Sequence, residues 1–217
     1  MTVASETQVY NMALNAIGAR NNITSPSEQS REAEVCRLWY AAVRDQILAA
    51  AFWPEATKSA YLALTSEQED TTWVAGEPMP GFTYLYAQPS DLLRPQYLSS
   101  FEPFRVSSEG INSNTSTALL TYTYRNELVP SWSSGLQMAI VYGLAANICM
   151  PLTGKANRTN LMVKQANDLV LEAREASANW NVEAQESVPD WIQARGYGVQ
   201  QVSRYVYPFG SLLSVNS

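Results

Sequence analysis

The chain has 217 residues, of which 46% are hydrophobic and 16% charged, with a formal net charge of −6 and a sequence pI of about 4.7. This length supports one well-buried core without requiring two domains. The acidic balance, with no run of Lys and Arg, argues against tight nucleic-acid binding. The absence of histidine removes the commonest general base and the commonest metal ligand.

The low charge content means that uncharged polar residues and tyrosines must cover much of the surface. Six Trp and twelve Tyr fit a protein that buries surface against neighbours; an ordinary polar monomer is the alternative. Cys36 and Cys149 lie in apolar helical patterns, so we expect buried packing thiols in a reducing compartment. Residues 1–10 lack the features of a secretory signal, and no membrane span is expected.

In chain order, a first helix is predicted to begin at Ser5 with a capping box to Gln8, and to end at Gly18. The stretch 25–28 (Ser-Pro-Ser-Glu) predicts the start of a second helix, which Pro54 stops. The buried face of this second helix is expected to comprise Cys36, Tyr40, Val43, Ile47 and Ala50, widened by Trp39 and Ala42.

Arg44 and Asp45 lie near the middle of the second helix. Adjacent opposite charges on a helix favour one of two interpretations. They form a solvated surface pair, which contributes little to stability, or they make a contact between subunits.

From residue 58 to residue 125 the apolar period changes to two, which is typical of antiparallel strands with one buried face. Leu120, Tyr122 and Tyr124 alternate in this way, with threonines on the other face. Pro95 and Pro103 bracket a further strand, and proline suits a sheet edge. Residues 112–116 predict a polar loop that could reach towards a partner.

Pro130-Ser131 predicts the start of a third helix, and residues 151–154 predict the turn into a fourth. The second and fourth helices are both long and carry apolar stripes, so we expect them to pair. Gly143 and Ala146 are small enough for a close helix crossing. The stripe of the third helix comprises Leu136, Ile140, Leu144 and Ile148, and that of the fourth Met162, Ala166, Leu169, Ala173, Ala176 and Trp180.

These elements predict an α+β fold, in which an antiparallel helical bundle is formed from N- and C-terminal segments, 1–54 and 130–186. Residues 55–129 form an inserted antiparallel β-sheet or sandwich, and residues 187–217 an extended C-terminal tail. The tail is apolar but glycine-punctuated, so it is expected to dock on another chain or on its own body. Its expected partner-binding residues are Tyr197, Tyr205, Tyr207, Phe209, Leu212 and Leu213.

The sequence does not favour catalysis. Gly154-Lys155 lacks the residues that a phosphate-binding loop needs on either side. Two cysteines without histidine do not make a standard zinc site, and no cofactor is expected. Acidic groups in polar runs leave glycosidic acid–base chemistry as a minor alternative. These groups are Glu32 with Glu34, Glu67 with Glu69 and Asp70, and Glu183 with Glu186.

Three series of residues follow one another in a fixed order along this chain. The first series lies in the second helix and comprises Cys36, Tyr40, Arg44-Asp45, Leu48 and Trp53. The second comprises Tyr84, Pro89, Asp91, Leu92 and Arg94. The third comprises Ala145-Ala146, Pro151-Leu152, Gly154, Ala173, Asp190-Trp191 and Ala194-Arg195. Each series is a packing pattern, and only their order along the chain is specific. In that order they resemble one family, the podovirus tail tubular A proteins, which are head-to-tail adaptors or connectors.

The resemblance implies a structural virion protein, made in the host cytoplasm, that forms a twelve-membered ring between the portal protein and the tail nozzle (tubular B) protein. DNA would pass through the ring without specific binding, and no membrane would be involved. The resemblance also implies that the helices form the ring wall and that the C-terminal tail reaches the portal. Two alternatives are a head-closure or minor structural protein of another phage assembly and, less favoured, a virion-associated cell-wall hydrolase.

Overall fold

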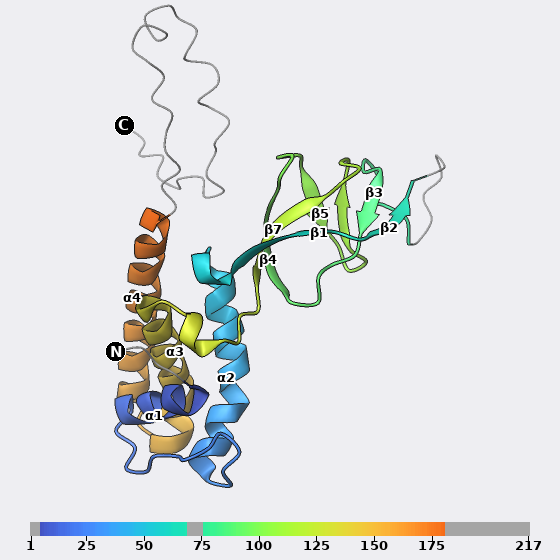
Figure 1. Cartoon of the computed structure of the whole chain (residues 1–217). Helices are drawn as coiled ribbons and strands as arrows, with labels where there is room; N and C mark the ends of the chain where they lie inside the picture. Colours follow the sequence, from blue (N-terminus) through green and yellow to red (C-terminus); the bar gives the residue numbers. More distant parts are fainter. Residues whose placement is uncertain (1–4, 69–75, 181–217) are drawn as a thin grey trace, which may run out of the picture. The chain divides into compact units, whose positions relative to one another are not determined.

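The computed structural model describes residues 5–68 and 76–180, apart from the side chains of residues 176–180. Within this range the fold is α+β, with four α-helices and two antiparallel sheets (Figure 1). The α-helices are α1 (Glu6–Ala16), α2 (Arg31–Ala50), α3 (Ser134–Thr153) and α4 (Ala156–Trp180). Two short 3-10 helices, η1 (Pro54–Ala56) and η2 (Val129–Ser131), lie where the chain passes between helices and sheets.

The start of α1 is confirmed, because the Ser5 hydroxyl accepts a hydrogen bond from the backbone N–H of Gln8 at 3.3 Å. The predicted start of α2 is wrong. Its N-cap is Ser30, whose hydroxyl accepts from the N–H of Ala33. The Glu28 carboxylate turns back to accept from the backbone and hydroxyl of Thr24, so the earlier segment forms a turn instead of a first helical turn.

Both predicted boundaries of α3 are also wrong. Ser133 caps this helix, while Pro130-Ser131 belongs to η2. At the other end the helix continues through Pro151 to Thr153 and closes at Gly154, whose φ of 65° is left-handed. Proline removes only one backbone donor, and so near a helix end it costs little of the hydrogen-bond ladder.

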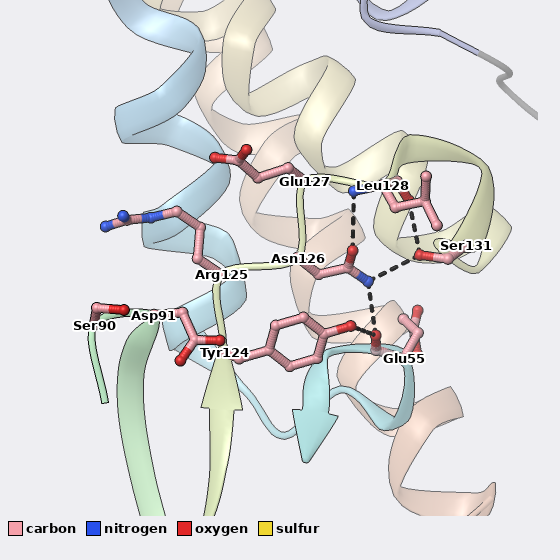
Figure 2. Close-up of a pocket in the computed structure, with 9 residues that line it drawn as sticks. All are labelled: Glu55, Ser90, Asp91, Tyr124, Arg125, Asn126, Glu127, Leu128 and Ser131. Atoms are coloured by element: carbon pink, nitrogen blue, oxygen red, sulfur yellow. Dashed lines mark hydrogen bonds between the residues drawn. The ribbon is translucent and has the colours of Figure 1, made fainter. Parts of the chain in front are cut away.

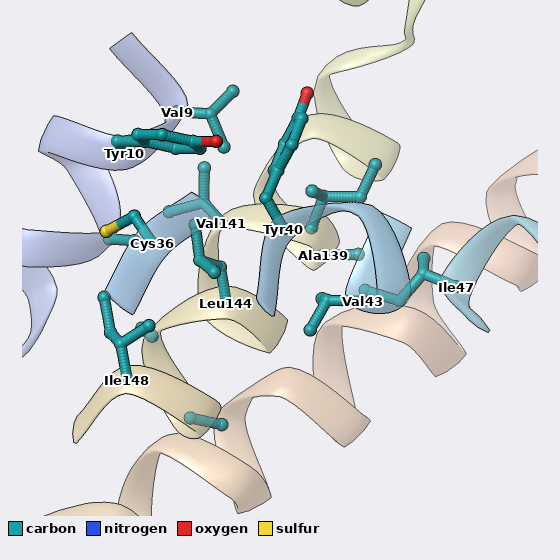
Figure 3. Packing of buried hydrophobic residues seen from close by; sticks show 14 of the residues in the cluster. Val9, Tyr10, Cys36, Tyr40, Val43, Ile47, Ala139, Val141, Leu144 and Ile148 are labelled. Atoms are coloured by element: carbon teal, nitrogen blue, oxygen red, sulfur yellow. The ribbon is translucent and has the colours of Figure 1, made fainter. Parts of the chain in front are cut away.

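The predicted buried face of α2 is largely confirmed, as Cys36, Tyr40, Val43 and Ile47 are all at least 93% buried. Figure 3 shows these side chains against residues of α1 and α3, with the Tyr10 and Tyr40 rings edge to face. Ala50, predicted as the last residue of this face, is exposed. The predicted widening of the face is also wrong, because Trp39 is 38% exposed and Ala42 is exposed.

Helix α3 is buried on most sides, because it packs against α1, α2 and α4. The predicted pairing of α2 with α4 is therefore wrong: α3 lies between them (Figure 1). By length and composition α3 could also cross a membrane, but 61% of its most apolar window is buried within the protein, as in an ordinary core helix. Because α3 contacts three neighbouring helices, apolar residues occupy most of its circumference. A search for one apolar stripe does not identify all of these buried sides.

The two sheets share one small core. Sheet A has the strand order β1-β7-β4, and sheet B the order β2-β3-β6-β5, with every pair antiparallel. Side chains of both sheets meet in a cluster that includes Tyr86, Ile111, Leu120 and Tyr122. The strands are β1 (Thr57–Tyr61), β2 (Leu64–Glu67), β3 (Tyr84–Tyr86), β4 (Leu92–Leu98), β5 (Phe104–Val106), β6 (Ile111–Ser113) and β7 (Leu119–Tyr124).

Strand β7 lies in the centre of sheet A, and both of its faces are buried. The prediction of a single buried face is wrong here: Thr121 is 6% exposed and Thr123 fully buried. The Ser59 and Thr121 hydroxyls bond across the strands at 2.7 Å, which satisfies polar groups inside the sheet. Pro95 lies within β4, which is an edge strand of sheet A, as expected for a strand that contains proline. The prediction that Pro95 bounds the strand is wrong: it lies inside the strand, next to one of two irregularities in register.

The predicted polar loop at residues 112–116 is wrong in its first half. Asn112 and Ser113 belong to β6, between β3 and β5, and are fully buried. The Asn112 side chain accepts from the N–H of Met79 at 2.8 Å and donates to the carbonyl of Arg105 at 3.3 Å. Since every polar atom in a buried strand needs a partner, such an amide can occupy a core position.

Candidate functional site at the junction of helices and sheets

The chain passes between helices and sheets twice, and we name residues 51–57 and 125–133 the two crossing segments. Asn126, which is 3% exposed, ties them together. Its amide nitrogen donates to the carbonyl of Glu55 at 2.7 Å and to the Ser131 hydroxyl at 2.9 Å, and its amide oxygen accepts from the N–H of Leu128 at 3.0 Å (Figure 2). One side chain thus holds three backbone or hydroxyl groups from both crossing segments.

Glu55 completes this connection. Its carboxylate accepts a hydrogen bond from the N–H of Ser133, the N-cap of α3, at 2.9 Å. A carboxylate at a helix N-terminus is favoured by the unpaired N–H groups there. The first crossing segment therefore caps the helix that follows the second.

Arg44 and Asp45 belong to an ion-pair network at the same junction, which we name the junction network. The guanidinium of Arg44 lies 2.9 Å from the Asp45 carboxylate and 3.1 Å from that of Glu127. The other oxygen of Asp45 lies 2.8 Å from Nε of Arg125. Arg44 is only 6% exposed, so the prediction that Arg44 and Asp45 form a solvated surface pair is wrong. Both charges have partners within the chain, and a role between subunits stays a prediction.

Sheet A has a second ion pair beside the second crossing segment. Lys58 of β1 pairs with Asp91, whose other oxygen accepts from the Tyr122 hydroxyl at 3.0 Å. Partial burial alone would raise the pKa of Asp91, but the hydrogen bonds from Lys58 and Tyr122 outweigh it and lower this pKa. The bond to Asp91 in turn raises the pKa of Lys58. The carbonyl of Asp91 accepts from the N–H of Arg125 at 2.8 Å, which links the pair to the junction.

Arg94 joins β4 to the C-terminal end of α2. Its guanidinium lies 4.6 Å from the centre of the Phe52 ring and donates to the carbonyl of Ala49 at 3.3 Å. The last carbonyls of a helix lack partners within the helix and carry the negative end of its dipole, so a cation is favoured there.

The junction carries a shallow, open depression, shown in Figure 2. Its carboxylates already have partners: Glu55 accepts from Ser133, Asp91 from Lys58 and Tyr122, and Glu127 pairs with Arg44. The geometry is that of a polar joint that holds backbone segments together. The residues lining the depression are Glu55, Ser90, Asp91, Tyr124, Arg125, Asn126, Glu127, Leu128 and Ser131.

The structure brings together parts of two of the three sequence series, since Arg44, Asp45, Asp91 and Arg94 all lie at or beside this junction. Sequence reasoning missed their partners, although the polar run Arg125-Asn126-Glu127 between a strand and a helix was a usable signal.

The predicted tail residues, Tyr197 through Leu213, lie outside the described residues, as do Glu69, Asp70, Glu183 and Glu186. Glu32, at the start of α2, accepts a hydrogen bond from the Asn21 amide at 3.1 Å on the exposed surface, and the neighbouring Glu34 is exposed. The two cysteines are buried free thiols as predicted, and burial raises the pKa of Cys36 to about 12.

Several large apolar side chains are exposed among the described residues. The α2 face contains Leu38 (72% exposed) and Trp39, and the sheet face contains Tyr61, Tyr97 and Phe101. We name the exposed surface of α4, away from its buried residues Met162, Ala166 and Ala173, the α4 face; Leu161, Val163 and Leu171 are exposed there as separate side chains. Strand register places Tyr61 opposite Leu119 and Tyr97 opposite Thr121, so both tyrosines lie on the side of sheet A away from the shared core. The rings of Tyr97 and Phe101 stack with their centres 5.7 Å apart.

Comparison of the chain with protein-family models and with curated proteins gives no match.

Proposed function

We propose that this chain is a structural subunit of a virus particle, a head-to-tail adaptor of the podovirus tail tubular A kind. In this proposal it forms a ring, twelve-membered as the sequence resemblance implies, between the portal protein and the tail nozzle protein. The helices assemble as a bundle into the ring wall, DNA passes through the channel without specific binding, and residues 187–217 dock on the portal. The chain makes and breaks no covalent bond.

The observation that carries the proposal is the exposure of large apolar side chains on both α2 and α4. Because α3 lies between these helices, the α2 face and the α4 face belong to helices on opposite sides of α3 (Figure 1). A contact between two different faces of identical subunits is head-to-tail, and it closes into a ring when the rotation between subunits allows. Exposed apolar patches are typical of surfaces that meet another protein.

Charge substitutions test this contact. We expect Leu38→Glu on the α2 face, or Leu171→Glu on the α4 face, to prevent ring formation, because each places a carboxylate in an apolar contact. An equimolar mixture of the two variants should form a heterodimer, since one variant retains an intact α4 face and the other an intact α2 face. Native mass spectrometry, with and without the portal protein of the same phage, measures the particle mass.

Ser108→Glu, an exposed position between β5 and β6, serves as the matched charge control and should leave the ring mass unchanged. Rings formed by both face variants would reject the helical contact. A wild-type chain that neither forms a ring nor sediments with the portal protein would reject the adaptor role itself.

A further inference from the structure

The helices and the sheets have separate hydrophobic cores. The helical core draws on α1, α2, α3 and α4 and on apolar residues of the crossing segments, such as Trp53 and Trp132, while the sheet core draws on the strands of both sheets, and the two clusters of buried residues share no member. Leu93 of β4 also packs against the helical core. Beside these apolar contacts, polar contacts join the two parts: the junction network, the Asn126 bonds and the Arg94 contact with the end of α2. Parts of a protein that meet through polar contacts tend to move relative to each other unless those contacts hold them.

The junction network is the contact that links the middle of α2 to the second crossing segment. Asp45 accepts from two arginines at once, Arg44 at 2.9 Å and Arg125 at 2.8 Å. Arg44 is buried, and its other carboxylate partner, Glu127, has a side chain that is 68% exposed. Loss of the Asp45 charge would therefore leave a buried guanidinium held by one exposed carboxylate, and removing one partner of a buried pair is costly.

The crossing segments can act as pivots. Each contains a proline and a short 3-10 helix, η1 with Pro54 and η2 with Pro130. The hydrogen bonds of the Asn126 side chain go to Glu55, Leu128 and Ser131 of the two segments, and not to the middle of α2. If the sheets turned as a unit about these segments, the Asn126 bonds could persist while the junction network opened.

We propose that Arg44, Asp45, Arg125 and Glu127 form an ionic latch that sets the orientation of the two sheets on the helices. With the latch closed, the sheets hold one orientation. With the latch open, they turn about the crossing segments while both cores stay folded. The latch goes beyond the adaptor role, and neither its argument nor its test depends on ring formation.

A distance measurement across the junction tests the latch. Nitroxide labels at Asn167→Cys on α4 and Ser108→Cys between β5 and β6 occupy exposed positions on the two parts. Cys36 and Cys149 are buried, so the labels should react with the added thiols. Double electron–electron resonance on the full chain should give one narrow distance distribution, because a closed latch allows a single orientation.

In Asp45→Asn the distribution should broaden or gain a second maximum, while circular dichroism still reports the same helix and strand content. Lys58→Gln is the matched control, since it breaks the ion pair of Lys58 with Asp91, both on the sheet side of the junction, leaves all four residues of the junction network in place and should leave the distribution narrow. If Asp45→Asn fails to fold, Arg125→Gln, which alters a 42% exposed side chain, replaces it. A distribution that stays narrow in the folded latch variant, or that is already broad with Asp45 present, would overturn the latch.

Discussion

Asn126 shows how one residue stabilises a junction between two layers of structure. It is almost fully buried, and its amide makes three hydrogen bonds, to Glu55, Leu128 and Ser131. Neutral hydrogen bonds contribute about 1 kcal/mol each, and a group left buried without its partner costs more. The three hydrogen bonds of the Asn126 amide therefore hold the two crossing segments together.

We predict that Asn126→Ala lowers the free energy of unfolding by about 2–3 kcal/mol, because it leaves the Glu55 carbonyl and the Leu128 N–H without their amide partner. Urea titration followed by circular dichroism measures the loss. Asn167→Ala, at an exposed position on α4, is the control and should change stability by less than about 0.5 kcal/mol. An equal loss in both variants would contradict the role assigned to Asn126.

The Lys58–Asp91 pair predicts a pH dependence. The folded-state pKa of Asp91 is below its ordinary value of 3.8, so the stabilisation is present above that value and is lost as pH falls through the folded pKa. At neutral pH we expect the free energy of unfolding of the wild type to exceed that of Lys58→Met by up to about 1 kcal/mol, which is the usual contribution of an exposed ion pair. The two stabilities should converge as pH falls below the folded-state pKa of Asp91. Urea titrations of both proteins at several pH values measure the two free energies of unfolding. If their difference does not change with pH, the role assigned to the Lys58–Asp91 pair is wrong.

At the scale of elements, the close approach of α2 and α3 depends on Gly143. A Cβ at this position would lie 2.7 Å from Cδ1 of Ile47 and 3.0 Å from Cγ1 of Val43. Both side chains are buried in the helical core and have little room to move. The predicted close crossing at Gly143 is thus confirmed, and it explains why a residue with poor helix propensity lies in the middle of α3.

We predict that Gly143→Ala destabilises the protein by about 1–2 kcal/mol, because the overpacking exceeds the gain in helix propensity. Ile47→Val removes the methyl group that the new Cβ would meet, so the double variant should recover part of the loss. A double-mutant cycle by thermal or urea unfolding measures this coupling. Independent, additive effects of the two substitutions would show that the crossing at Gly143 is not tight.

At the scale of the whole molecule, the described residues contain both hydrophobic cores, and residues 1–181 form one compact unit. The boundaries proposed at residues 54, 130 and 187 stay predictions. Deletion of residues 196–217 should leave the melting temperature nearly unchanged, because residues that the structure describes already form both hydrophobic cores. The same deletion should abolish co-sedimentation with the portal protein. A truncated chain that still binds the portal would move the docking site into the described part.

Local patterns in the sequence were enough to locate the helices and most of their buried faces, though not the start of α2 or the ends of α3. The Ser5 cap of α1 and the buried series Cys36, Tyr40, Val43 and Ile47 depend on neighbours within one or two helical turns. The period of two likewise located the β region, as in β7. Such patterns show which side of a helix or strand faces a core, because side chains on that side recur about every 3.6 residues in a helix and every two residues in a strand.

Only the tertiary structure decided which elements pack together and which polar residues are buried. Helix α3 between α2 and α4, the buried Asn112 of β6 and the junction network all depend on partners far away in the chain. Arg44 and Asp45 look like an ordinary surface pair until Arg125 and Glu127, about 80 residues later, complete their bonds. A polar side chain can be buried wherever groups distant in the sequence supply its hydrogen bonds or ion pairs. The spacing of residues along one helix or strand does not indicate where those groups lie.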